Sequence, residues 1–313
     1  MPAVSVVMSC YNAESHVVAA LDSIVEQTFA DWELIVVNDG STDGTGDILD
    51  GYAERDVRVR VLHQGNHGQQ HAANQAISQA KSDLIARMDA DDIAAPNRLE
   101  LQINFMTGHP DVCLLGGQIK RIGDRGGGLV SNFPLGHENI VKFLCRNHHS
   151  VCNPTVIFRK VLFDQIGGYW EHDIAEDWDM FLRMSEHGQL ANLPEVLLSY
   201  RFHETSINGR RIVEAQLYNE FAAENFQRRQ KGVQELTIEE FRRAHRSNRL
   251  FGKIAFNLDS HSIGQYRRAV AELYGGRLFI GCGRLIFSMM MSPGRTMRRI
   301  GNILARRVSK ASV

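Results

Sequence analysis

Three aspartates in four positions, Asp89, Asp91 and Asp92, close the short apolar segment 84–88. A short apolar run of this kind predicts a buried strand of a parallel sheet. Ligands of open α/β sheets bind just beyond the carboxyl ends of the strands, so we expect these acids to lie where a ligand binds. Asp89 and Asp91 are two positions apart and point the same way in an extended segment. Mg2+ or Mn2+, hard cations that also take phosphate oxygens, would relieve the repulsion between them. The alternative is a solvated acidic loop.

A second acidic group, Glu176 and Asp177, opens a segment of helical character that continues to Arg183. A carboxylate at this place could act as the base that removes a proton from an attacking hydroxyl. The alternative is an ordinary helix start, because acids are stabilised near the positive end of the helix dipole and Asp is a preferred N-cap residue.

The segments that must position these acids alternate between strand and helix patterns. Strands are expected over 4–8, 34–37, 57–62 and 84–88, with helices between them, and further strands over 112–116, 118–122, 156–158 and 196–200. This order predicts a doubly wound α/β sheet, in which right-handed crossovers bring the loops after the first, second and fourth strands to one edge. Tyr11, Asp39 and Asp91 would converge there and suit a nucleotide: an aromatic ring for the base, an acid for base or ribose, and acids with a metal for the diphosphate.

Glycine-rich phosphate loops of other nucleotide-binding proteins are absent from the sequence. There is no G-x-G-x-x-G after the first strand and no G-x-x-x-x-G-K-S/T, which argues against a dinucleotide dehydrogenase and a P-loop enzyme. A nucleotidyltransferase would usually carry a glycine-rich, basic loop after the first strand, where this chain has the sequence CYNAE over 10–14.

Composition is that of an ordinary globular protein: 313 residues, 43% hydrophobic, 23% charged, with a formal net charge of −1. This balance gives no sign of a nucleic-acid partner, and none is expected. The five cysteines show no C-x-x-C spacing, which favours a reducing compartment without structural zinc. No signal-peptide pattern and no apolar stretch of about 18 residues is present, so we expect a cytoplasmic protein without a membrane span.

The last third of the chain has a different character. Helix-forming residues dominate after Arg210, and a boundary near 208 would divide a catalytic domain, 1–208, from a helical region, 209–313. From Arg277 onward the sequence has eight basic residues and no acid, mixed with apolar residues. A basic amphipathic helix can lie in an anionic membrane interface, which would make the protein peripheral at the inner face of the cell membrane. The alternative is a helical appendage with a solvated arginine-rich face.

Four motifs in chain order resemble the inverting family-two glycosyltransferases of the GT-A fold over roughly the first two thirds of the chain: Val4–Met8 with Tyr11-Asn12, Asn38–Asp43, Met88–Asp92, and Glu176-Asp177. The resemblance implies a Rossmann-like, mixed, mostly parallel sheet flanked by helices. It also implies metal-assisted transfer of a sugar from a nucleoside-diphosphate sugar, with a UDP-sugar favoured, to a hydroxyl of a glycan, cell-surface polysaccharide or lipid-linked acceptor. A single displacement would invert the anomeric centre.

Residue roles follow from the same resemblance. Tyr11 would stack on the nucleobase, Asp39 would hydrogen-bond it, and Asp89 would lie near the ribose. Asp91 would hold Mn2+ or Mg2+, with His203 as a second candidate for a metal or phosphate contact, and Asp177 would be the general base. Further donor contacts would come from Asn12, Asn74 and Arg87, and the acceptor side from His148, Asn153, Glu176 and Trp178.

One departure from the family pattern concerns the donor. Many relatives carry an arginine just before the asparagine of the third helical segment, where this chain has Ala73 before Asn74. A positive contact to the donor is lost, or Arg87 supplies it. The alternative to an enzyme is a non-catalytic nucleotide-sugar or glycan-binding protein on the same fold, against which intact Asp91 and Asp177 argue.

Overall fold

The computed structural model describes residues 1–122, 128–170, 174–201, 212–247 and 278–292, with positions 262, 265–266, 269 and 272. The chain divides into two compact units. The first comprises Met1–Arg121, Leu129–Arg201 and Ala222–Gly232, and the second comprises Ile122–Gly128, Phe202–Phe221 and Val233–Val313. The predicted domain boundary near 208 and the candidate ligand His203 both lie outside the described residues.

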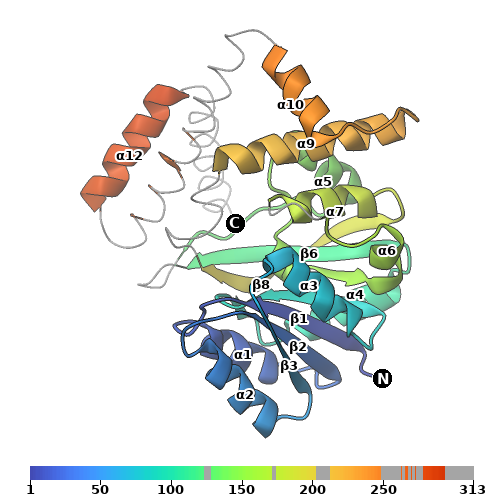
Figure 1. Ribbon diagram of the computed structural model, residues 1–313, viewed down its shortest axis with the longest axis vertical. Helices are drawn as coiled ribbons and strands as arrows, with labels where there is room; N and C mark the ends of the chain where they lie inside the picture. Colours follow the sequence, from blue (N-terminus) through green and yellow to red (C-terminus); the bar gives the residue numbers. More distant parts are fainter. Residues whose placement is uncertain are drawn as a thin grey trace, which may run out of the picture. The chain divides into compact units, whose positions relative to one another are not determined.

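An eight-stranded mixed sheet forms the centre of the first unit, with the strand order β3-β2-β1-β4-β7-β6-β8-β5 (Figure 1). The half from β3 to β4 is parallel, as the alternation of strands and helices predicts. Beyond β4 the pairs β4–β7, β7–β6 and β8–β5 are antiparallel. The strand bounds are β1 Val4–Cys10, β2 Trp32–Asp39, β3 Val59–Gln64, β4 Leu84–Asp89, β5 Ile93–Ala94, β6 Val112–Ile122, β7 Ile157–Arg159 and β8 Gln189–Arg201.

Alternate side chains of the central strands enter two separate cores, one on each face of the sheet. Leu34 and Val36 of β2 belong to one core, and Ile35 and Val37 belong to the other. Helices α1, α2 and α4 supply buried residues to the first core, and α3, α5, α6 and α7 to the second. The bounds are α1 Val17–Val25, α2 Thr45–Arg55, α3 Gln69–Ser78, α4 Arg98–Gly108, α5 His137–Leu144, the 3-10 turn η1 Asn153–Thr155, α6 Lys160–Gln165 and α7 Glu176–Met184.

The prediction of two strands over 112–116 and 118–122 is wrong, because β6 runs unbroken through both. Gly116 and Gly117 do not form a turn; they lie within β6 where side chains of β8 come close to its backbone. A Cβ atom at Gly116 would lie 2.4 Å from Asn192 Oδ1, and one at Gly117 would lie 2.4 Å from Leu197 Cδ1. Glycine within a strand can mark such a close approach, and here it lets β8 pack tightly against β6.

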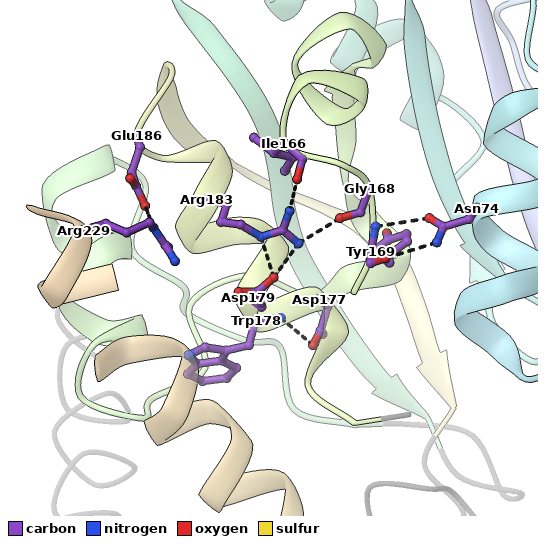
Figure 2. Close-up of polar contacts among 10 residues, drawn as sticks. All are labelled: Asn74, Ile166, Gly168, Tyr169, Asp177, Trp178, Asp179, Arg183, Glu186 and Arg229. Atoms are coloured by element: carbon purple, nitrogen blue, oxygen red, sulfur yellow. Dashed lines mark hydrogen bonds and ion pairs between the residues drawn. The ribbon is translucent and has the colours of Figure 1, made fainter. Parts of the chain in front are cut away.

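Three further helices follow β8: α9 Ile212–Gln230, α10 Ile238–Ser247 and α12 Leu278–Met291. The part of α9 from Ala222 onward belongs to the first unit, where Ala222 and Ala223 enter the second core and Arg229 pairs with Glu186 at 2.7 Å (Figure 2). In the second unit, the rings of Phe221 and Phe241 lie 5.5 Å apart. None of the described helices is long and apolar enough to cross a membrane.

Candidate active site

Strands β1, β2 and β4 end at the same edge of the parallel half-sheet. Cys10 at the end of β1 is paired with Asn38 of β2, and the preceding Ser9 is paired with Asp89 of β4. The three loops that carry the predicted motifs therefore begin side by side. Tyr11 directly follows β1, and 53% of its surface is exposed, so its ring is available for stacking at this edge.

Asn12 binds the loop after β1 to the loop after β2. Its backbone has a φ of +48°, in the left-handed region that asparagine tolerates better than most residues. The Asn12 N–H donates to Ser41 Oγ at 3.1 Å, and its side-chain oxygen accepts from the Thr42 N–H at 2.8 Å. The Ala13 N–H also donates to Thr45 Oγ1 at 2.8 Å. The predicted donor residue Asn12 thus fixes the loop in which Tyr11 lies.

Asp39, at the end of β2, is buried and hydrogen-bonded to the turn that leads into α3. One carboxylate oxygen accepts from Gln64 Nε2 at 2.6 Å and from the His67 N–H at 2.9 Å, and the other accepts from the Gly68 N–H at 2.9 Å. A carboxylate has about four acceptor positions, so roughly one remains for a further donor. Asp39 therefore holds the turn that leads into α3 with most of its acceptor positions.

The acids at the end of β4 form a cluster in which Asp89, Asp91 and Asp92 each offer a carboxylate oxygen within 4.8 Å of the others. Asp92 is buried, and its Oδ1 accepts from the Arg201 N–H at 2.7 Å, whereas its buried Oδ2 has no partner among the described residues. Arg201 Nε also donates to the Asp91 backbone carbonyl at 2.9 Å. Three convergent carboxylates with an unpartnered buried oxygen fit a hard divalent cation.

Arg87 lies buried beside this cluster, with only 1% of its surface exposed. Its Nη2 is 3.4 Å from Asp89 Oδ1, while its Nε and Nη1 have no partner among the described residues. Buried Arg98 donates from Nη2 to the Arg87 carbonyl at 2.7 Å and fixes the backbone of β4 there. The predicted donor residue Arg87 thus places a positive charge next to the acids.

Glu176 and Asp177 begin α7, and the charge of Asp177 raises the pKa of Asp89 at the end of β4. The residue before them, Ala175, is the N-cap, with a φ of +58° and no side-chain capping bond. Asp177 is therefore not the cap, and its Oδ1 accepts from the Trp178 N–H at 2.8 Å (Figure 2). Asp177 thus accepts from a backbone N–H of the first turn of α7, so the helix-start alternative stays open beside the role of a base.

Burial raises the pKa values of Asp89, Glu176 and Asp177. Burial of Asp89, opposed by Arg87 and reinforced by Asp91 and Asp177, raises its pKa to about 6. Burial and the Asp177 charge raise the pKa of Glu176 to about 7. Burial also raises the pKa of Asp177, against the Trp178 N–H and the Arg87 charge, which lower it. Perturbed carboxyls of this kind are common at functional sites, and burial is the dominant cause here.

Arg183, in the last turn of α7, connects this helix to the segment after α6 by hydrogen bonds. Arg183 Nε donates to Asp179 at 2.6 Å, Nη2 donates to the Gly168 carbonyl at 2.8 Å, and Nη1 donates to the Ile166 carbonyl (Figure 2). The amide of Asn74 exchanges two hydrogen bonds with the Tyr169 backbone, at 3.1 and 3.2 Å. Asn74, predicted to contact the donor, therefore has both ends of its amide engaged within the chain.

The predicted acceptor-side residues lie in different surroundings. His148 is exposed in the loop after α5, whereas Asn153 is buried and accepts from the Tyr169 hydroxyl at 3.3 Å. Trp178 is buried in the second core, and its Nε1 donates to the Leu144 carbonyl at 3.2 Å. Of these three, His148 alone is open to solvent. The site also contains Arg201 and Arg98, which no local sequence pattern indicates, and Asp92, which the acidic run in the sequence predicts.

Comparison with known proteins agrees with this architecture. The profile of the family described as Glycosyl transferase family 2 matches residues 5–167, which is more than half of the chain. The amylovoran biosynthesis glycosyltransferase AmsE of Erwinia amylovora is 32% identical over 211 residues, covering 66% of this chain and 79% of that protein. A glycosyltransferase of Haemophilus influenzae is 30% identical over 219 residues, covering 64% of this chain and 66% of that protein. The chain belongs to glycosyl transferase family 2.

Solved structures confirm the fold class. The structure of Staphylococcus aureus TarS 1–349 in complex with UDP-GlcNAc matches with a TM-score of 0.57 and 19% identity, covering 87% of this chain and 82% of that chain. The mannosyltransferase PcManGT from Pyrobaculum calidifontis, in complex with GDP-Man and Mn2+, matches with a TM-score of 0.56 and 18% identity, covering 97% and 80%. The predicted GT-A fold and the predicted enzyme class, a glycosyltransferase, are thus confirmed.

Proposed function

We propose that this chain is an inverting glycosyltransferase that transfers a sugar from a nucleoside-diphosphate sugar, with a UDP-sugar favoured, to a hydroxyl acceptor. The observation that carries the proposal is the pairing of two acidic groups in the first unit. One is a cluster at the end of β4 with a buried oxygen that has no partner among the described residues, and the other is the half-buried Glu176-Asp177 pair at the start of α7.

Asp91, together with Asp89 and Asp92, would hold the divalent cation. Carboxylate oxygens are the ligands preferred by Mg2+ and Mn2+. When bound, such a cation would supply Lewis-acid neutralisation of the charge that develops on the diphosphate leaving group. The structural neighbour PcManGT, whose complex holds GDP-Man and Mn2+, supports this assignment. Arg201 would orient the cluster through its bonds to Asp92 and to the Asp91 carbonyl.

Asp177 would be the general base. The acceptor hydroxyl is a poor nucleophile at neutral pH, and a carboxylate within reach can take its proton as it attacks. Burial raises the pKa of the Asp177 carboxyl, and the Arg87 charge acts in the opposite direction. With no protein nucleophile required, one displacement at the anomeric carbon inverts its configuration.

The loops after β1 and β2 would receive the nucleotide. The exposed ring of Tyr11 would stack on the base, and Asp39 would use its remaining acceptor position for a base N–H. Asp89 would lie toward the ribose. The acceptor would approach from the side of His148, and the name of the relative AmsE, an amylovoran biosynthesis enzyme, supports a growing polysaccharide as the acceptor class.

A panel of nucleotide sugars, each with Mn2+, Mg2+ or EDTA, tests the proposal by thermal shift and by release of nucleoside diphosphate. Ligand binding to the native state raises its apparent stability by mass action. We expect a metal-dependent shift with one UDP-sugar, and a product whose anomeric configuration is inverted. No shift with any donor would instead favour a non-catalytic glycan-binding protein on this fold, and release of pyrophosphate would indicate a nucleotidyltransferase.

A further inference from the structure

Helix α12, coloured red-orange in Figure 1, has several apolar side chains exposed to solvent. Phe279 is 95% exposed and Met290 is 75% exposed. Ile286, also exposed, lies between them at helical spacing, and Ile280 and Phe287 widen the same face. The apolar face of α12 is defined by these five residues, and none of them carries a charge.

The opposite side of α12 is small and polar, and it is the side that packs. Gly281 and Ser288 are buried, seven positions apart on one face. The Ser288 hydroxyl donates to the Ser262 carbonyl at 2.8 Å, and Ser262 Oγ lies 2.9 Å from the Ser288 carbonyl. A surface helix of a globular protein normally buries its apolar face. In α12 the apolar face is exposed to solvent and the small, polar face is buried.

Positive charge accompanies this face in the sequence. From Arg277 to the end of the chain there are eight basic residues and no acid. Within α12, Arg284 lies at the edge of the apolar face and contacts Gln265 at 3.2 Å and Glu272 at 3.8 Å. Helix α12 has 14 residues, whereas about 20 are needed to cross a bilayer, so it could lie in an interface but could not span one.

We propose that the apolar face of α12 docks into the interface of a lipid bilayer that contains anionic lipids. Exposed apolar side chains are stabilised by entering the boundary between headgroups and acyl chains, and the basic residues that accompany α12 in the sequence are attracted by the negative surface potential. A second copy of the chain is the less favourable occupant, because both copies carry the same excess of basic residues from Arg277 onward and like charges repel. Docking would hold the enzyme beside acceptors anchored in the bilayer.

Co-sedimentation with vesicles tests this proposal on the full chain. Phosphatidylcholine vesicles with and without phosphatidylglycerol would be mixed with the wild type, with the variant F279E/M290E, and with the matched control V57E/V161E. Val57 is 97% exposed, Val161 is exposed on α6, and the control adds the same two charges to the first unit. We expect the wild type and the control to bind the phosphatidylglycerol vesicles alike, and F279E/M290E to bind about tenfold more weakly or worse.

Several results would overturn the proposal. If both variants bound the vesicles equally well, α12 would not be the membrane-binding element. If the wild type bound both vesicle compositions equally well, anionic lipid would not be required. A dimer in light scattering that F279E/M290E alone dissociates, without vesicle binding by the wild type, would assign the face to a second copy. Thermal unfolding of both variants at the wild-type midpoint excludes misfolding. None of these measurements needs a sugar donor, so the outcome is independent of the proposed catalysis.

Discussion

The ends of β2 and β4 carry acids at the same edge of one sheet, yet the fold treats them in opposite ways. Asp39 at the end of β2 receives three hydrogen bonds from the chain itself. Asp89, Asp91 and Asp92 at the end of β4 converge on one another, and Asp92 keeps a buried oxygen without a partner among the described residues.

This difference indicates that the acids at the end of β4 lower the stability of the metal-free fold, whereas Asp39 does not. The Asp39 carboxylate already accepts three hydrogen bonds within the folded chain, and these hold the turn that leads into α3. The β4 acids repel one another, and a bound cation would remove that cost. Substitutions at the two strand ends should therefore have different main effects. Those near β4 and α7 should mainly lower catalysis, and those near β2 should mainly lower stability.

Asp177→Asn should have the largest effect, because it removes the proposed base while keeping the side-chain shape. We expect kcat to fall by a factor of about 10² to 10⁴, with donor affinity by calorimetry within a few-fold of the wild type. Asp83→Asn, an exposed acid at the other end of β4, is the control for the loss of charge and should keep full activity. Full turnover by Asp177→Asn would remove this residue from the base role.

Asp91→Asn should abolish the metal dependence of donor binding. We expect calorimetry in Mn2+ to give an affinity about tenfold or more below that of the wild type, and the two proteins to agree in EDTA. The same Asp83→Asn variant should bind as the wild type does under both conditions. Unchanged affinity of Asp91→Asn in Mn2+ would break the comparison, because the β4 cluster would then have no need of a cation.

Arg87→Met should change the pH dependence of the reaction. The Arg87 charge lowers the pKa values of Asp89, Glu176 and Asp177, so its removal raises all three. A base with a higher pKa is protonated over more of the acidic range, so the acid limb of kcat should move to higher pH. The activity at pH 6 relative to pH 8 should fall about tenfold. Arg87→Lys should restore the profile, whereas a purely structural role would lower stability without moving the limb.

Metal affinity should depend on pH because Asp89 has a pKa of about 6. Protons compete with Mn2+ below that value, so affinity should be constant above about pH 7 and fall by about tenfold per pH unit below pH 6.

The stability of the metal-free protein should change with pH in the opposite direction. Since the pKa is raised from about 3.9 in the unfolded chain, the folded state binds more protons between pH 4 and 6, and its stability falls as pH rises through that window. Thermal unfolding with Mn2+ and with EDTA checks both statements.

Asp39→Asn should mainly destabilise the protein, the smallest effect in this series. The amide keeps one acceptor oxygen but turns a donor toward backbone N–H groups, so we expect a loss of about 1–3 kcal/mol. The midpoint of thermal unfolding should drop by a few degrees. Asp31→Asn, an exposed acid before β2, is the matched control and should leave the midpoint unchanged. A stable Asp39→Asn protein with greatly weakened donor binding would show that Asp39 serves the ligand more than the fold.

Local sequence was sufficient for much of the fold. Apolar runs buried on both faces predicted β1, β2 and β4, and turn residues between them predicted the alternation with helices. It was insufficient around Gly116 and Gly117, where two strands over 112–116 and 118–122 were predicted and one continuous strand is found. Whether two glycines turn a chain or admit a neighbouring strand depends on what lies opposite, and here Asn192 and Leu197 of β8 lie opposite.

The acids of the candidate site were visible in the sequence because their spacing and their place after apolar runs are local properties. The sequence by itself thus determined that Asp89, Asp91 and Asp177 exist in chemically suitable settings. Only the tertiary structure decided which residues they contact. Arg201, 109 positions beyond Asp92, donates to its carboxylate, and the predicted donor residue Asn74 is hydrogen-bonded to Tyr169, 95 positions away. Pairing over such separations follows from how strands and helices pack, and so does the outward apolar face of α12. No window of neighbouring residues contains that information.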